Sequence, residues 1–290
     1  MNTLSSRNAA RHATFSTRTS APVTVHRRRM YVDCRFGQLH LHTAFPSNGG
    51  FDERPPLVCV HPSPATGRVF RKLLADLGQD RSVYAPDLPG YGESDAPESR
   101  PSVADYAAAL GDMLDTLRLR EVDVLGHQAG SLVVAELAVA RPHQVRRVVL
   151  AGVPVFDPKE REAFHHRPWP APAREDGAHL AEEWQRVRRW RGPGMPLARV
   201  GQVLAAALQA GDTAAWGPAA AADYPAADRL PLLRQPALLL RSRDEFWDMT
   251  ARADALMGEA RRVDLANQDG GLFDAGVVDV VRYLREFLDR

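Results

Sequence analysis

Residues 126–130, Gly-His-Gln-Ala-Gly, stand between a short apolar run and a helical stretch. Two glycines at this spacing allow a sharp turn and close packing of the helix on the strand. The middle residue, Gln128, has a side-chain amide that donates hydrogen bonds, but no neighbouring base can turn it into a nucleophile. The helix that starts here also directs its positive end at the turn. These residues predict a site that polarises an oxygen atom without covalent attack, or a turn that Gln128 merely fills.

Two adjacent acids, Asp244 and Glu245, follow the apolar run of residues 237–241. A carboxyl group in a dry pocket has a raised pKa and can move protons near neutral pH. His61 ends another apolar run, and His127 directly precedes Gln128. Each of these histidines has either a role in the site or a structural one.

Short apolar runs alternate with helical stretches from residue 30 onward, and the predicted strands cover residues 30–34, 38–42, 57–61, 82–86, 122–126, 145–151, 237–241 and 262–265. This alternation predicts an α/β fold with a mostly parallel central sheet flanked by helices. It stops over residues 155–230, which are rich in proline and alanine. We expect this segment to form a helical cap above the carboxyl ends of the strands, where such sheets bind ligands. The core would then consist of residues 30–154 and 231–290.

Composition excludes several classes of protein. The net charge is +1, whereas nucleic-acid binders usually carry a basic excess. No apolar run approaches the roughly 18–20 residues of a membrane span. Two cysteines indicate a reducing cytoplasm. We expect a small-molecule substrate, no nucleic acid, no membrane, no metal and no cofactor, and a homodimer is left open. Residues 1–29 contain no acid and are expected to be a disordered tail.

Three motifs together resemble the α/β-hydrolase superfamily: residues 126–130, His-Pro-Ser-Pro at 61–64, and Asp-Leu-Pro-Gly-Tyr-Gly-Glu-Ser at 87–94. The resemblance covers residues 30–290 and implies the α/β-hydrolase fold with a cap. It places the nucleophile at Gln128 and the catalytic histidine at Gly270 or Gly271. No histidine follows His179, so the triad lacks both its nucleophile and its base. Asp244 or Glu245 is the acid that remains.

The resemblance also implies an oxyanion hole, a pair of backbone amides that stabilises a negatively charged oxygen. Its donors would be the amides of Ala129 and Ser63, because Pro62 and Pro64 have no N–H. Three tryptophans, Trp184, Trp216 and Trp247, are candidates to line a substrate pocket.

The leading hypothesis is a non-hydrolytic enzyme, namely a cyclase, isomerase, lyase or dehydratase. It would act on a carbonyl-rich small molecule in bacterial secondary-metabolite biosynthesis. The catalytic candidates are Gln128, Asp244, Glu245 and His61. The substrate-binding candidates are Ser63, Ala129, His127 and the three tryptophans. The alternatives are a non-catalytic binding protein and a hydrolase with relocated catalytic groups.

Overall fold

The computed structural model describes residues 24–47, 49, 53–166, 173–189, 191–192, 195–268 and 271–290. Within these residues an eight-stranded sheet has the order β1-β2-β4-β3-β5-β6-β7-β8. The strands are β1 (Val25–Cys34), β2 (Gly37–Pro46), β3 (Arg54–Val60), β4 (Arg81–Pro86), β5 (Val122–His127), β6 (Val145–Ala151), β7 (Ala237–Ser242) and β8 (Ala260–Leu265). The β1–β2 and β2–β4 pairs are antiparallel and the other pairs are parallel. The predicted α/β architecture is confirmed.

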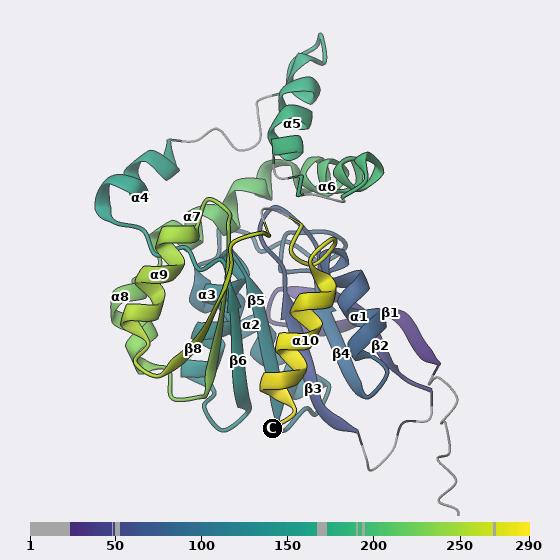
Figure 1. Ribbon diagram of the computed structural model, residues 1–290. Coiled ribbons are helices and arrows are strands. Elements are labelled where there is room, and N and C mark those ends of the chain that lie inside the picture. Colours follow the sequence, from purple (N-terminus) through teal and green to yellow (C-terminus); the bar gives the residue numbers. More distant parts are fainter. Residues whose placement is uncertain are drawn as a thin grey trace, which may run out of the picture.

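Helices cover both faces of the sheet (Figure 1). They are α1 (Arg71–Leu77) and α10 (Val277–Leu288) on one face, and α2 (Val103–Thr116) and α3 (Ala129–Ala140) on the other. Side chains alternate along a strand, so successive residues of β3 enter different cores. Leu57 and Cys59 belong to the core on the side of α1 and α10, and Val58 and Val60 belong to the core on the side of α2 and α3. A sheet buried on both faces explains why its central strands read as continuous apolar runs.

The N-terminal strand starts earlier than the sequence predicted. β1 begins at Val25, which pairs with Pro46 of β2, so residues 25–29 are strand and not tail. Residues 25–29 are mostly exposed and arginine-rich, so pairing with β2 and not an apolar pattern forms this part of the strand. Residues 1–23 of the predicted tail lie outside the described residues.

In the described part of the predicted cap, residues 155–230, every regular element is helical: α4 (Pro158–His165), α5 (Ala178–Arg189), α6 (Leu197–Ala210), a 3-10 turn (Gly211–Ala215), α7 (Trp216–Asp223) and α8 (Ala226–Arg229). A further 3-10 turn (Leu230–Leu232) leads back to the core, where α9 (Trp247–Leu256) follows β7. Figure 1 places α4 to α7 above one end of the sheet. α5 and α6 share a small apolar cluster of Val187, Met195 and Val200.

One buried and one half-buried ion pair join the helices of residues 155–230 to the core. Arg199 of α6 donates from Nε to Asp274 in the loop after β8, at 2.8 Å. Glu136 of α3 accepts hydrogen bonds from Tyr224 and Arg229. Among the described residues, no helix is both long enough and apolar enough to cross a lipid bilayer.

Candidate active site

The turn between β5 and α3 has the sharp geometry that its glycines predict. Its apex, Gln128, has φ 52° and ψ −119°, which is a strained conformation for any residue but glycine. A Cβ on Gly126 would lie 2.2 Å from the carbonyl oxygen of Gly130, and one on Gly130 would lie 2.4 Å from that of Val60. Both glycines are therefore required by the close approach of backbone to backbone.

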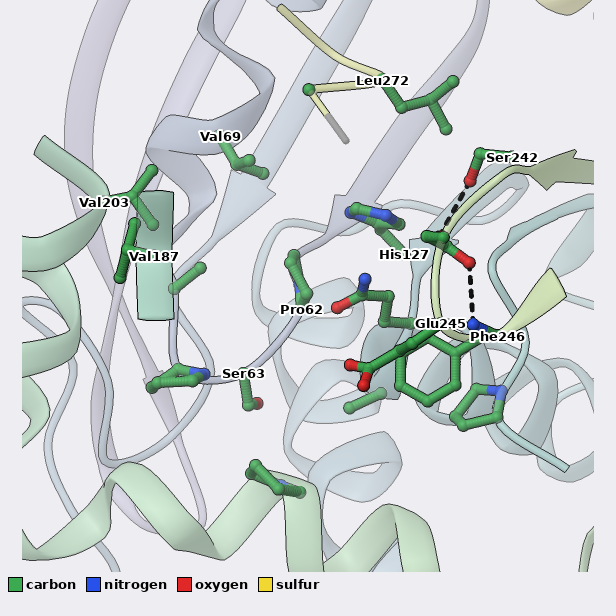
Figure 2. A pocket seen from close by; sticks show the side chains of 18 of the residues that line it. Pro62, Ser63, Val69, His127, Val187, Val203, Ser242, Glu245, Phe246 and Leu272 are labelled. Atoms are coloured by element: carbon green, nitrogen blue, oxygen red, sulfur yellow. Dashed lines mark hydrogen bonds between the residues drawn. The ribbon is translucent and has the colours of Figure 1, made fainter. Parts of the chain in front are cut away.

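A cavity of about 170 Å³ lies between this turn and the helices above it. Its wall is mostly apolar, and Figure 2 shows Val187 and Val203 on one side with Ser242 and Phe246 across from them. The polar residues of the wall are Ser63, His127, Gln128, Arg186, Arg199, Ser242, Asp244, Glu245 and Asp274. The predicted Gln128, His127, Ser63, Ala129, Asp244 and Glu245 thus line one space. This arrangement suits an apolar ligand with a few polar atoms.

Asp244 is the wall residue best suited to proton transfer. Burial raises the pKa of its carboxyl to about 6, and hydrogen bonds from the Ser242 hydroxyl and the Phe246 amide, both at 2.9 Å, offset only part of that effect. The charge of Glu245 raises the pKa further. A Cβ on Gly152 would lie 2.9 Å from Asp244 Oδ2 and 3.5 Å from Gln128 Cγ, so the carboxyl group and the apex side chain are neighbours.

His127 contributes a neutral imidazole to the same wall. Burial alone lowers the pKa of its ring to about 4. The ring packs edge-on against Phe273 at 5.1 Å, and Nδ1 is buried with no hydrogen-bond partner among the described residues. Figure 2 shows the ring between Pro62 and Ser242. The neutral ring of His127 can therefore form a hydrogen bond with a ligand, but at neutral pH it does not carry the second proton that an acid catalyst would transfer.

The two predicted amide donors also lie at the cavity. Ala129 is the first residue of α3, so its N–H has no acceptor within the helix. Ser63 lies in the loop after β3 and lines the cavity, and its Oγ is buried without a hydrogen-bond partner in the described part of the chain. Glu245 lies on the same rim but is exposed, unlike Asp244.

Four other candidates lie away from the cavity wall. His61 is fully buried, its Nδ1 donates to the carbonyl of Pro62, and its Nε2 accepts from the Leu88 amide, which is a structural arrangement. Trp184 packs against the α5–α6 cluster, Trp216 lies beside Gly90, and the Trp247 ring lies 3.8 Å below the Arg241 guanidinium. The contacts that these side chains make are with neighbouring protein groups.

The loop after β8 brings Gly271, Leu272, Phe273 and Asp274 to the wall, while Gly270 lies outside the described residues. No side chain at Gly271 can replace the missing histidine. The sequence analysis did not identify Arg199 and Asp274, because only the packing of α6 on this loop brings them together. His40 and His42 were also missed, although their alternate spacing on a strand was a usable signal.

Comparisons with known proteins agree with this architecture. A family model described as alpha/beta hydrolase fold matches residues 55–189. An (E)-2-((N-methylformamido)methylene)succinate hydrolase of Acinetobacter baylyi is 30% identical over 198 residues, which is 67% of this chain and 73% of that protein. A 2-hydroxy-6-oxo-2,4-heptadienoate hydrolase of Pseudomonas putida is 35% identical over 101 residues, 33% of this chain and 37% of that protein.

Some curated relatives match over a shorter part of their length. For an uncharacterized protein of Mycobacterium tuberculosis, at 34% identity, the matched part is 34% of this chain and 29% of that protein. Among solved structures, the enol-lactonase of Burkholderia xenovorans superposes with a TM-score of 0.73 at 18% identity, covering 90% of this chain and 100% of that one. Sequence and structure agree, and the chain belongs to the α/β-hydrolase fold family.

Proposed function

We propose that this protein is a non-hydrolytic enzyme that moves a proton on a carbonyl-containing small molecule. The reaction would be an isomerisation, cyclisation, elimination or dehydration. The single observation that carries the proposal is the carboxyl group of Asp244, with a pKa of about 6, beside an elbow whose apex is Gln128. Such a carboxyl group is a competent base at neutral pH, whereas the apex residue has no nucleophilic atom.

The residues of the wall define the steps. The amide groups of Gln128 and Ala129 bind the carbonyl oxygen of the substrate and stabilise the negative charge that develops there. The ionised Asp244 accepts a proton from the carbon next to that carbonyl, and the electron pair of the broken C–H bond forms the enolate. Asp244 then returns the proton to another atom of the same molecule. The apolar wall excludes water, so the enolate is not protonated by solvent.

The lining of the cavity favours a neutral, largely apolar substrate. Each of its two arginines already faces a carboxylate, since Arg199 donates to Asp274 and Arg186 donates to Glu183. Two paired guanidinium groups leave little surplus positive charge to hold an anionic substrate. The hydrolase relatives supply an alternative, in which Asp244 activates a water molecule for attack on an ester or an enol lactone.

The test is an incubation of the purified protein with a metabolite extract from a strain that lacks the gene. Mass spectrometry should show one compound converted into an isomer, or into a product that is lighter by one water. The Asp244→Asn variant should lose this conversion, and Asp248→Asn, whose carboxylate is 91% exposed on α9, should keep it. A product heavier by one water, or labelling of a serine by a fluorophosphonate, would replace the proposal with the hydrolase alternative. Equal conversion by Asp244→Asn would remove Asp244 from the mechanism.

A further inference from the structure

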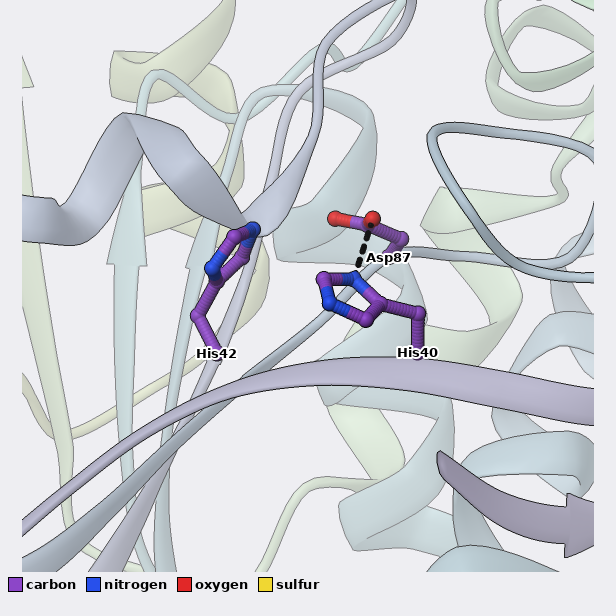
Figure 3. A group of neighbouring side chains, drawn as sticks. All are labelled: His40, His42 and Asp87. Carbon is purple, nitrogen blue, oxygen red and sulfur yellow. Dashed lines mark hydrogen bonds and ion pairs between the residues drawn. The ribbon is translucent and has the colours of Figure 1, made fainter. Parts of the chain in front are cut away.

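A second cluster of titratable side chains lies outside the cavity, where β2 meets the loop after β4. His40 and His42 occupy alternate positions of β2 and therefore face the same side of the sheet. The Asp87 amide donates to the His40 carbonyl, which fixes Asp87 beside them. One ligand atom from each of the three residues lies within 4.8 Å of the other two. Figure 3 shows both rings rising from the strand, with Asp87 against His40.

We propose that His40, His42 and Asp87 form a binding site for a late first-row divalent metal ion such as Zn²⁺. The site is independent of the proposed reaction. Neutral imidazoles are preferred ligands of such ions. The two rings are close enough to share one ion, because their centroids are 4.7 Å apart.

Asp87 and His40 offer adjacent ligand atoms. His40 Nδ1 and Asp87 Oδ2 lie 2.9 Å apart and share a proton, so an ion that replaces this proton would bind both residues. Asp87 Oδ1 accepts one hydrogen bond, from the Gly67 amide at 2.7 Å.

His42 supplies the second nitrogen and the route of entry. Its ring is half-buried, while His40 is only 3% exposed, so an ion would reach the site past His42. Among the described residues no side chain or backbone group hydrogen-bonds the His42 ring, so coordination would displace no existing bond. Water would complete the coordination shell.

A bound ion would connect the sheet to the cap. The loop that follows Asp87 contacts the cap, where Thr213 Oγ1 donates to the Gly90 carbonyl at 2.5 Å and Gln209 Nε2 donates to that of Gly92 at 3.0 Å. Fixing Asp87 to β2 through an ion should therefore stiffen the junction between core and cap. The consequence to measure is a rise in melting temperature with Zn²⁺, because a ligand that binds only the folded state stabilises it.

The experiment titrates the full-length, chelator-treated protein with Zn²⁺ alone by calorimetry and follows its thermal unfolding. We expect one ion per chain at this site, and His42→Asn should weaken its binding at least tenfold. The matched control His143→Asn changes an exposed histidine and should bind as the original does. Affinity unchanged in His42→Asn, or absence of binding, would overturn the proposal.

A spectroscopic measurement keeps the proposal testable if His42→Asn does not fold. Long-range ¹H–¹⁵N spectra of the unaltered protein resolve the nitrogens of each imidazole ring. Zn²⁺ should shift one nitrogen of His40 and one of His42 and leave His61 unchanged, since both nitrogens of His61 already bond to backbone. Shifts confined to other histidines would contradict the site.

Discussion

Asp87 is buried and Asp244 is half-buried, each follows a strand of the same sheet, and their surroundings set their acidity in opposite directions. Burial by itself would raise the pKa of Asp87, but the hydrogen bond from His40, the neighbouring His61 and the Gly67 amide together lower it. Burial raises the pKa of Asp244 to about 6, and hydrogen bonds from the Ser242 hydroxyl and from backbone amides, that of Phe246 first, offset only part of the effect. Asp87 has a histidine partner and Asp244 has no cationic partner among the described residues.

The contrast separates a structural carboxylate from a reactive one. A carboxylate with several hydrogen-bond donors stabilises its loop, whereas one with too few makes the fold less stable and is ready to exchange a proton. The two loops therefore differ in how far hydrogen-bond partners offset the effect of burial on the carboxyl pKa, and not in burial alone. Each of the following substitutions changes either one of these aspartates, a hydrogen-bond partner of Asp244, or the elbow residue beside Asp244.

The largest effect is expected at Asp87. Asp87→Asn removes the charge that faces His40 and turns one acceptor into a donor, which opposes the amide either of Gly67 or of Glu93. Hydrogen bonds to a buried carboxylate contribute roughly 1.5–3 kcal/mol each, so their loss should lower the free energy of unfolding by about 3–5 kcal/mol. Urea unfolding of the metal-free protein at pH 7 measures this cost. A loss below about 1 kcal/mol would show that the loop does not depend on its carboxylate.

Asp244→Asn should have the opposite sign. The folded pKa of about 6 lies above the ordinary aspartate value of 3.8, so the stability that Asp244 contributes is complete below pH 3.8 and is lost as the pH rises through 6. Asparagine does not ionise and keeps that stability. The variant should be more stable at pH 8 by about 2–3 kcal/mol and equal near pH 4. Thermal unfolding at both pH values measures the difference, and a destabilised variant at pH 8 would contradict the raised pKa.

Sequence patterns predicted most of this fold because its strands are buried on both faces. Runs such as residues 57–61 and 237–241 read as strands without any tertiary information, and the glycines of 126–130 fixed the elbow. The start of β1 could not be read in this way. Its residues His26 to Arg29 are exposed on an edge strand, and only their pairing with β2 gives them the conformation of a strand.

The site was predictable only where a motif fixes a residue to the end of a strand. Gln128, His127 and Asp244 have such positions, so the sequence placed them in one space. The contact between Arg199 and Asp274 joins residues 75 positions apart and depends on how α6 packs. The tryptophans show the limit of sequence patterns, because an aromatic residue gives the same pattern whether it contacts a ligand or, like Trp247, a neighbouring arginine.

A smaller effect is expected from the partner of Asp244. Ser242→Ala removes the hydroxyl that donates to Oδ2, and the apparent pKa of Asp244 should then rise above 6. The lost hydrogen bond to a carboxylate corresponds to about 1–2 kcal/mol. Carboxyl ¹³C titration by NMR measures the pKa, with Ser82→Ala, a serine bonded to Glu53, as the control. An unchanged pKa would mean that the Ser242 hydroxyl does not affect the acidity of Asp244.

The smallest change in stability is expected at the elbow, where it also decides what Gln128 does. At φ 52° and ψ −119° glycine is the only unstrained residue, so Gln128→Gly should gain about 1 kcal/mol of unfolding free energy. Arg118→Gly, at the other described non-glycine residue of positive φ, should gain a similar amount and serves as the control. If Gln128→Gly loses stability while Arg118→Gly gains it, the amide is holding the turn together. If Gln128→Gly gains stability and loses turnover, the strain at the apex is retained for the hydrogen bond that Gln128 offers to a ligand.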